Sequence, residues 1–442
     1  MPGVVDDLTR LVAIPSCAFP GYPAEPVMAM AEATVELLRR SGLPAARMID
    51  VPGGYPVVYG EVPAPPGAPT VLLYAHYDVQ PAPPEQGWSV DPWTPMVRDG
   101  RLYGRGAADD KSGIAVHAAT LQAMRAVYGD DLPVGLRVVI EGEEETQSHL
   151  GDFVEANPDL FAADVFVIAD GGNEQVGVPV LEVSTRGAVV LTVEINTLQQ
   201  PVHSGIFGGG APDALMAMVR TLATLHDESG DVAVPGLHHD AWGGADTSED
   251  LFRRAGGLLD DTPLVGTGSL ASRLWASPSV NVIGLDAAPT AGAVNALAPS
   301  ARAVVSLRIP PGADPEREQE QLIAHLKKAT PWGLRLDVVQ ADTWPGWSTS
   351  SDGPAFTTAR SAMADVFGAA VEVIGSGGSI PLLNVLSGIS PGGEFVLWGL
   401  SDGESSNLHS ADESVDLAEL HRIAEIQVLF LSRLSRRDSP PL

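Results

Sequence analysis

Several segments of the sequence carry histidine and carboxylate side chains that could together hold metal ions. In chain order they are His76 and Asp78, Asp109 and Asp110, the glutamates within 141–145, Asp170, and His409. Several carboxylates in one crevice would repel one another, and their pKa values would rise until some became neutral. Divalent cations remove this repulsion, and histidine nitrogen with carboxylate oxygen suits Zn²⁺, Mn²⁺ or Co²⁺ better than Ca²⁺. The sequence therefore predicts a metal site built from nitrogen and oxygen ligands.

Predicted strands would bring these side chains to one place. Apolar runs typical of buried strands lie at 70–75, 134–141, 164–169 and 394–400, and a helical pattern lies at 112–129. Strands that alternate with helices indicate a mainly parallel sheet flanked by helices. Ligands bind such sheets at the carboxyl ends of the strands, which is where the candidate residues stand.

Each candidate taken alone also has an ordinary structural explanation. A histidine after a strand is often a hydrogen-bonded structural residue, and a run of glutamates is often a solvated loop. Asp109 and Asp110 could simply cap the helix that follows them. Ligand-type residues at several separate strand ends are much harder to explain by chance than any one of them, and this favours the metal site.

The middle of the chain has a different character, which indicates an inserted domain. It contains strand patterns at 188–195, 301–310 and 334–340 and helical patterns at 213–227 and 314–330, with Pro/Gly-rich surface loops expected at 52–69 and 235–267. After it, a helix at 354–368 and the strand at 394–400 resemble the first section again. We therefore predict an α/β catalytic domain in two parts, 1–186 and 349–442, with an inserted α+β (ferredoxin-like) lid and dimerisation domain at 187–348.

Composition and charge exclude several classes of protein. The 442 residues, 45% of them hydrophobic, predict two globular domains and rule out general disorder. The formal net charge of −30 argues against nucleic acid or an anionic membrane as a partner. The single cysteine, Cys17, permits no intramolecular disulfide, and the N-terminus does not read as a signal peptide. No run approaches the roughly 18 apolar residues of a membrane span, so we expect a cytoplasmic enzyme.

The same segments resemble the motifs of the M20 metallopeptidases, and among them the carnosinase-like cytosolic dipeptidases. The resemblance rests on "AHYDVQP" (75–81), the stretch from Trp88 to Gly113, "EGEEETQS" (141–148), "IAD" (168–170) and "LHS" (408–410). It runs over essentially the whole chain. It implies that Asp109 bridges two metal ions and that a cis peptide follows Asp109. The remaining ligands it implies are His76 and Asp170 for one ion, and Glu145 and His409 for the other.

The resemblance also assigns residues that act beside the metals. Asp78 would orient the His76 ring, because residues 76 and 78 of an extended chain point the same way. Glu144 would be the general base, which takes a proton from the metal-activated water and later gives it to the leaving amine. We expect two divalent ions per chain, Zn²⁺ in the first place, with Mn²⁺ or Co²⁺ as alternatives.

Further positions match the parts of the family that hold the substrate. "PVHSGIFGG" (201–209) implies that His203 stabilises the oxyanion in the neighbouring subunit of a homodimer formed through the lid. Arg308 would bind the substrate carboxylate, helped by Asn295, Gly378 and Ser379. Ser376 stands where such dipeptidases often carry an acidic residue, so we expect a weaker dependence on a free substrate amine than on a free carboxylate.

We expect the protein to hydrolyse the peptide bond of dipeptides or similar small peptides with a free C-terminal carboxylate. An N-acyl or N-carbamoyl amino-acid amidohydrolase of the same fold is the alternative, and "HYDVQP" and "ADDKSG" favour the dipeptidase. A non-catalytic metal-dependent binding protein is a third reading. Glu144 argues against it, because a general base has no role in binding alone.

Overall fold

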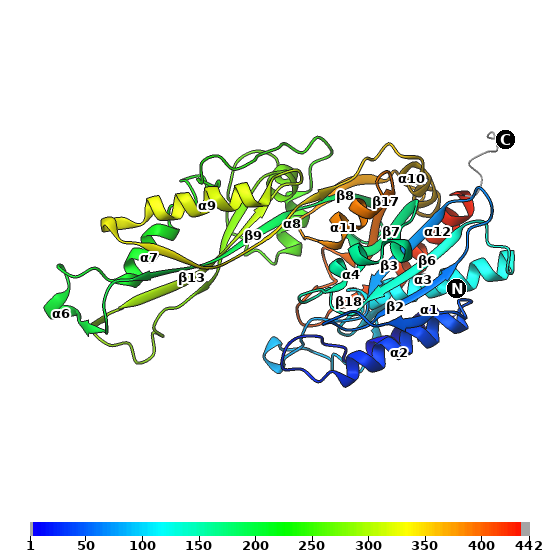
Figure 1. Ribbon diagram of the computed structural model, residues 1–442, viewed down its shortest axis with the longest axis horizontal. Helices are drawn as coiled ribbons and strands as arrows, with labels where there is room; N and C mark the ends of the chain where they lie inside the picture. The colour runs from blue at the N-terminus through cyan, green and yellow to red at the C-terminus, as the bar shows by residue number, and fades with distance from the viewer. Residues whose placement is uncertain (1–2, 435–442) are drawn as a thin grey trace.

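The computed structural model describes residues 3–434, and a nine-stranded sheet forms the right-hand half of the molecule in Figure 1. In spatial order this main sheet contains β1 (Arg47–Ile49), β2 (Val57–Val62), β6 (Gly135–Glu141), β3 (Thr70–His76), β7 (Val165–Asn173), β17 (Glu394–Asp402), β8 (Val180–Thr185) and β15 (Trp347–Ser348), and β16 (Glu372–Ser376) also pairs with β8. The central strands β6, β3, β7 and β17 are parallel, whereas β2 and β8 are antiparallel to their neighbours β6 and β17. The predicted mixed, mainly parallel sheet is confirmed.

Helices cover both faces of the main sheet. One face carries α1 (Val4–Val12), α2 (Glu25–Arg40), α3 (Lys111–Tyr128), α10 (Pro354–Phe367) and α12 (Leu417–Leu434), and the other carries α4 (Leu150–Ala156), α5 (Pro158–Phe161) and α11 (Leu382–Ile389). Side chains of β3 alternate between the two layers: Val71 and Leu73 pack with the first group, Leu72 and Tyr74 with the second. Because β3 is buried on both faces, its sequence is apolar without interruption, as expected for a central parallel strand.

A separate four-stranded antiparallel sheet extends away from the main sheet (Figure 1). Its order is β11 (Ser279–Leu285), β13 (Ser300–Ile309), β9 (Gly187–Asn196) and β14 (Leu336–Trp344), and α7 (Ala214–Leu222) and α9 (Pro315–Ala329) pack on one face. Alternate residues of β9, such as Val189 and Leu191, are fully buried under these helices. All four strands lie within the predicted insertion, and the exact domain boundaries stay a prediction.

Shorter elements complete the fold. They are the three-stranded sheet β4 (Met96–Arg98), β5 (Arg101–Tyr103) and β18 (Ser414–Asp416), the pair β10 (Val202–His203) and β12 (Ala296–Leu297), α6 (Ser204–Phe207), α8 (Glu249–Ala255), two 3₁₀ turns at Pro84–Gln86 and Pro331–Gly333, and a π-helical turn at Ser272–Ala276. Helix α8 lies inside the stretch predicted as a surface loop. Helix α7 ends at Leu222, earlier than predicted, because the chain turns and His226 forms a bridge with Val232.

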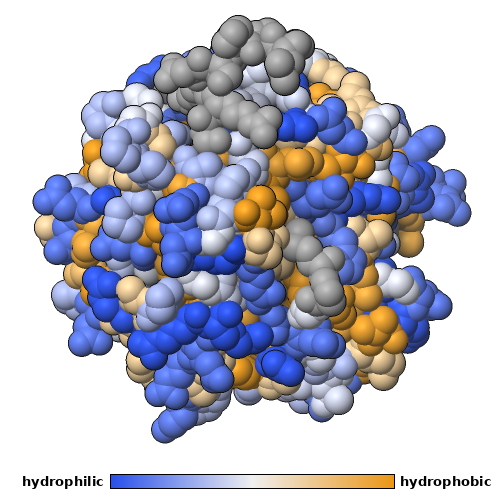
Figure 2. Space-filling view, turned by 90° about the vertical axis from the view of Figure 1, so that its right-hand side faces the viewer, coloured by the Kyte–Doolittle hydropathy of each residue, from blue (hydrophilic) through white to orange (hydrophobic). Residues whose placement is uncertain are grey.

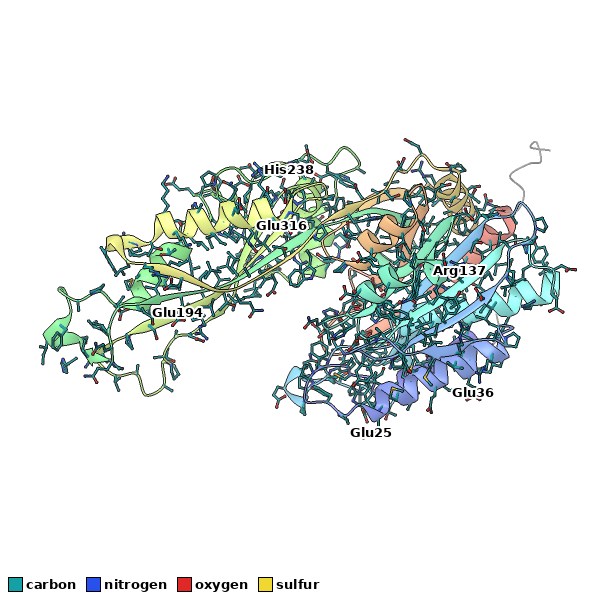
Figure 3. All side chains as sticks on the ribbon, viewed as in Figure 1. Glu25, Glu36, Arg137, Glu194, His238 and Glu316 are labelled. Carbon is teal, nitrogen blue, oxygen red and sulfur yellow. The ribbon has the colours of Figure 1, made fainter. Side chains whose placement is uncertain are left out.

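Acidic side chains are spread over both halves of the molecule. Glu25 and Glu36 lie on α2, Glu194 on β9 and Glu316 on α9, while Arg137 lies on β6 of the main sheet (Figure 3). On the face shown in Figure 2, at the end of the molecule far from the four-stranded sheet, hydrophilic and hydrophobic residues are interspersed. None of the helices in residues 3–434 is both long enough and apolar enough to cross a membrane.

Candidate active site

The ligand-type side chains meet at the carboxyl edge of the main sheet. His76 is the last residue of β3, Asp170 lies in β7, and Glu145 follows the end of β6. Asp109 directly precedes the residue that caps α3, and His409 stands in the loop between β17 and β18. Parallel neighbouring strands end on the same side of the sheet, so segments far apart in sequence converge there.

Asp109 lies between the two histidines. Its Oδ1 is 2.9 Å from Nε2 of His76, and its Oδ2 is 3.0 Å from Nε2 of His409. On one side Asp170 Oδ1 is 3.8 Å from the same His76 nitrogen, and on the other Glu145 Oε2 is 3.3 Å from the His409 nitrogen. One carboxylate thus faces two separate sets of ligand-type atoms, which is the geometry that a bridging ligand requires.

Asp110 is also near the first set, although the ligand set that the resemblance implied does not include it. A ligand atom from each of His76, Asp110 and Asp170 lies within 4.8 Å of the others. Both oxygens of Asp110 already accept backbone N–H groups, Oδ2 from His76 and Oδ1 from Gly113, each at 3.2 Å. Asp110 therefore caps α3 and fixes the His76 backbone. The peptide bond between Asp109 and Asp110 is cis, as the resemblance implied.

The charges of the site respond strongly to burial and to one another. Burial, with Asp170 next, raises the pKa of Glu144 well above its usual value, and burial also raises the pKa of Asp170. Hydrogen bonds to Asp109 and Glu145 raise the pKa of His409 to about 10. Burial tends to raise the pKa of Asp109, but its bonds to His409 and His76 outweigh that effect and lower it. The site contains more carboxylates than cationic groups, and bound cations would stabilise the carboxylates in their charged form.

The donor set fits divalent metal ions. Within the described part of the chain, Oε1 of Glu145 is buried and has no hydrogen-bond partner, an arrangement that leaves this oxygen available to a cation. The two groups of ligand-type residues contain histidine nitrogen and carboxylate oxygen and no thiolate. This combination suits Zn²⁺, Mn²⁺ or Co²⁺.

The chain also matches a family of known peptidases. A model of peptidase family M20/M25/M40 matches residues 72–433. The chain belongs to this family. It is therefore a metallopeptidase, a hydrolase that uses divalent metal, as the resemblance implied.

Relatives and solved structures of the family are similar over most of the chain. The cysteinylglycine-S-conjugate dipeptidase of Corynebacterium striatum is 39% identical over 370 residues, which are 82% of this chain and 81% of the relative. The Beta-Ala-His dipeptidase of Rattus norvegicus is 28% identical over 87% of this chain and 81% of its own. The crystal structure of human carnosine dipeptidase 1 superposes with a TM-score of 0.83 at 26% identity, covering 98% of this chain and 96% of that one.

In this M20 peptidase, Asp78 connects two of the segments that carry ligand-type residues. It is fully buried, and its carboxylate accepts the backbone N–H groups of Glu144 at 3.1 Å and Glu145 at 3.0 Å. Nδ1 of His76 is 3.1 Å from the Asp78 carbonyl and 3.4 Å from its Oδ1. Asp78 therefore lies where it can orient the His76 ring, and it also fixes the loop after β6.

A buried ion pair joins two further segments of the site, and the sequence analysis missed it. Arg105 Nη1 lies 2.7 Å from Glu413 Oε2, and both side chains are almost fully buried. Glu413 Oε1 accepts the backbone N–H of Asp109 at 3.1 Å, and Arg105 Nη2 donates to the carbonyl of Ser410 at 3.2 Å. The pair thus ties the Asp109 loop to the His409 loop. Neither residue has a distinctive local pattern, because their partners are about 300 positions away.

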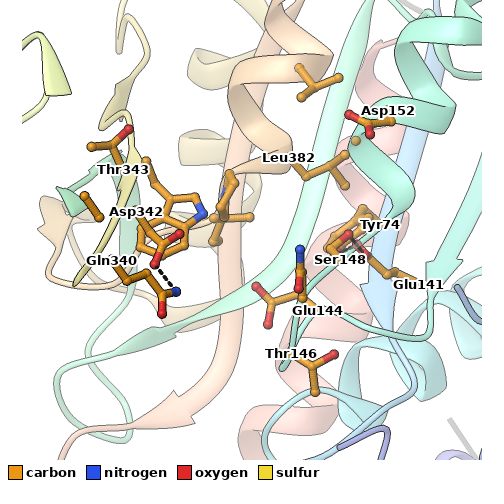
Figure 4. A pocket seen from close by; sticks show the side chains of 17 residues that line it. Tyr74, Glu141, Glu144, Thr146, Ser148, Asp152, Gln340, Asp342, Thr343 and Leu382 are labelled. Atoms are coloured by element: carbon orange, nitrogen blue, oxygen red, sulfur yellow. Dashed lines mark hydrogen bonds between the residues drawn. The ribbon is translucent and has the colours of Figure 1, made fainter. Parts of the chain in front are cut away.

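Glu144 points into a cavity of about 690 Å³ beside the ligand cluster (Figure 4). Residues of the main sheet and its loops, including Tyr74 and Ser148, form one wall, and β14 of the four-stranded sheet contributes Gln340 and Asp342 to the other. A carboxylate at this position can reach a water molecule or a substrate in the cavity, which is what a general base must do.

Two guanidinium groups meet where the substrate carboxylate was expected. Arg308 Nη1 donates to Ser379 Oγ at 2.9 Å, and Ser379 Oγ donates in turn to the carbonyl of Arg186. Burial and the nearby Arg308 lower the pKa of Arg186 to about 10. Among residues 3–434 no carboxylate forms an ion pair with either arginine. Sequence reasoning missed Arg186, although "STRG" marks the start of the insertion.

The remaining predicted residues are divided between two places. Gly378 lies in the loop after β16, where its N–H donates to Ser376 Oγ at 3.3 Å. His203 and Asn295 come together at the far tip of the four-stranded sheet, where the N–H of Ser204 donates to the Asn295 carbonyl at 2.9 Å. Helix α6, which follows His203, lies at the end of the molecule opposite the main sheet (Figure 1). Within one chain, His203 and Asn295 are thus not brought to the ligand cluster.

Proposed function

We propose that the protein hydrolyses the peptide bond of dipeptides or similar small peptides that bear a free C-terminal carboxylate. The observation that carries this proposal is the Asp109 carboxylate, whose two oxygens face His76 and His409 at 2.9 Å and 3.0 Å, with Glu144 aimed into the adjoining cavity. The similarity to proteins named as dipeptidases supports the same substrate class.

Different residues of the chain would bind the metal ions and transfer the proton. We assign His76 and Asp170 to one divalent ion, Glu145 and His409 to a second, and Asp109 to both, with Zn²⁺ as the expected metal. When bound, the ions polarise the scissile carbonyl and lower the pKa of a water molecule. Glu144 accepts the proton of that water and delivers it to the amine that leaves. Burial raises the pKa of Glu144, which makes its carboxylate a stronger base for the proton of that water.

The C-terminal carboxylate of the substrate would bind at Arg308, with Ser379, Gly378 and Arg186 close by. A planar guanidinium binds a carboxylate through two parallel hydrogen bonds. Burial, and after it the charge of Arg308, lowers the pKa of Arg186, and a bound anion would offset both effects. We therefore expect a strict preference for a free C-terminal carboxylate.

We further propose a homodimer in which His203 serves the active site of the partner subunit and stabilises the oxyanion. His203 lies at the tip of the four-stranded sheet, far from the metal ligands of its own chain (Figure 1). The edge strand β11 exposes apolar side chains, among them Ile283 at 64% of its surface. Exposed apolar edges are common sites of pairing with another chain. Asn295 would approach the partner's substrate together with His203.

A panel of substrates tests the proposed function. The protein, supplied with Zn²⁺, Mn²⁺ or Co²⁺ in turn, is assayed with small dipeptides, N-acetyl amino acids and N-carbamoyl amino acids. Faster hydrolysis of the dipeptides supports the proposal. Hydrolysis of the N-acyl or N-carbamoyl compounds alone would contradict it and identify an amino-acid amidohydrolase.

A further inference from the structure

Glu182 is a buried carboxylate next to the proposed metal ligands, and it has no role in the chemistry proposed above. It lies on β8, is 6% exposed, and lines a cavity of about 520 Å³. The same cavity is lined by Asp170, by Ser376 and by Leu408, the neighbour of His409. The cavity therefore opens directly beside the site assigned to the metals, and Glu182 forms part of its wall.

Contacts with the neighbouring backbone hold the Glu182 carboxylate in one position. Oε1 of Glu182 accepts the N–H of Gly172 at 3.0 Å. A Cβ atom on Gly171 would lie 2.9 Å from this oxygen and 3.2 Å from the backbone of Trp398, so a larger residue at 171 would displace the carboxylate from its present position. Because Gly171 directly follows Asp170, this contact fixes the position of Glu182 relative to a predicted metal ligand.

The negative charge of Glu182 has no cationic partner in the described residues. Glu182 accepts hydrogen bonds from the Gly172 N–H and the Ser376 hydroxyl, and no lysine, arginine or histidine of residues 3–434 forms an ion pair with it. Burial, and after it the Asp170 charge, raises the pKa of Glu182 to about 7. A buried carboxylate without a cation is costly, so a cationic ligand would be stabilised strongly at this position.

The ligand that fits best is an ammonium group. Glu182 belongs to neither of the clusters that could hold a metal ion. In a peptide, the α-nitrogen of the N-terminal residue lies roughly 2.5 Å from the carbonyl carbon that is attacked, because only Cα separates them. A substrate whose scissile carbonyl is at the metals must therefore place its free amine within a few ångströms of them, where Glu182 lines the cavity.

The segment formed by β8 and the residue after it carries opposite charges at two positions. Glu182 and Ser184 alternate along β8 and so share one face of the strand, and Arg186 directly follows the last strand residue, Thr185. The strand thus carries an anion, Glu182, near Asp170, and the residue after the strand, Arg186, is a cation near Arg308 and Ser379. Between them Ser184 Oγ is buried, and it has no hydrogen-bond partner within residues 3–434. A dipeptide with a free amine and a free carboxylate has the complementary pair of charges.

We propose that Glu182 binds the free α-ammonium group of the substrate's N-terminal residue. The inference rests on the proposed peptidase function and narrows it to peptides with an unblocked amine. It revises the expectation drawn from Ser376, because the carboxylate absent from β16 is supplied by the neighbouring strand, where Ile374 of β16 pairs with Glu182.

The test compares two substrates that differ only in the amine, alanylglycine and propionylglycine. The wild-type protein loaded with metal should cleave alanylglycine with the higher kcat/KM. Glu182→Gln should lower kcat/KM for alanylglycine by about 10–100-fold, the range expected for a charge-assisted hydrogen bond, and leave propionylglycine within about threefold. Ser376→Glu added to Glu182→Gln should restore the preference. Glu174→Gln, which changes another carboxylate lining the same cavity, is the matched control and should leave both substrates unchanged.

Each outcome is decisive. A loss of equal size on both substrates would mean that Glu182 has only a structural role and would overturn the inference, as would a Glu182→Gln variant with wild-type selectivity. Activity on propionylglycine shows that the variant is folded and metal-loaded. If the wild-type protein cleaved neither compound nor any other dipeptide, the proposed function itself would fail. Equal cleavage of both by the wild-type protein would leave the proposed function intact and refute the role of Glu182.

Discussion

The carboxylate of Asp78 accepts the backbone N–H of Glu145 at 3.0 Å. Asp78 is thus joined to the segment that carries one predicted metal ligand while its own segment carries another, His76. Neighbours that hold metal ligands in place typically change metal affinity by about 10–100-fold when they are removed. The site is consequently more than a set of ligands, because its loops are fixed to one another before a metal binds.

Asp78→Ala should weaken metal binding by about 10–100-fold, and excess metal should restore much of the activity. The reason is that the Glu144 and Glu145 N–H groups and the His76 ring lose a common partner. Activity titrated against free Zn²⁺ measures the change. Asp164→Ala is the matched control, because Asp164 accepts the N–H of Thr70 at 2.7 Å at the opposite end of β3. Equal effects of the two variants would contradict the assignment.

Removal of metal should abolish hydrolysis, and two ions per chain should restore it. Asp109→Ala should lose both ions, since each of its oxygens faces one histidine, whereas Glu145→Ala should lose mainly one. Metal content after dialysis, measured together with activity, tests this. Full activity of thoroughly demetallated protein, or a maximum of one ion per chain, would refute the two-metal proposal.

Glu144→Gln should keep both ions and lose about 10²–10⁴-fold in kcat, the usual contribution of a general acid–base group. The amide has nearly the same shape but cannot accept the proton. Glu143→Gln provides the control, because Glu143 is the preceding residue and contacts His149 at 3.1 Å. A near-normal kcat in Glu144→Gln with full metal content would show that the base is another group.

Mixed dimers should reveal whether His203 acts in the partner subunit. His203→Ala and Glu144→Gln homodimers should each be nearly inactive. A heterodimer of the two has one site with both an intact Glu144 and an intact His203, so it should regain activity. Purification through two different affinity tags isolates this species. Inactive heterodimers of verified composition would place His203 in its own subunit or outside the reaction.

Arg308→Ala should lower kcat/KM for a free dipeptide by about 10–100-fold, mainly through KM, because it removes a charge-assisted contact. Amidation of the substrate's C-terminus should have a similar effect on the wild-type enzyme and little further effect on the variant. Arg302→Ala is the control, because Arg302 lies on the same strand, β13, but pairs with Glu194 at 3.0 Å. An amidated substrate cleaved as well as the free one would exclude Arg308 from carboxylate binding.

The central strands and most candidate ligands could be predicted from the amino-acid sequence without a structure. The run 71–75 of β3 is apolar or aromatic because the strand is buried on both faces, and the histidine that ends this strand lies at the sheet edge. Such patterns are formed by consecutive residues, so they can be recognised in the sequence. The family motifs depend on the same short segments, so they too could be read without a structure.

Which distant residues meet could not be predicted from the sequence and follows from the folded structure. Glu182 has no ligand-type pattern around it, and its place beside Asp170 depends on the pairing of β8 with β16 and on the passage of Gly171 next to its carboxylate. Arg186 and Arg308, 122 positions apart, likewise meet through Ser379. Such contacts arise from strand pairing between remote segments, and the free energy of that pairing depends on the whole core and not on the local sequence.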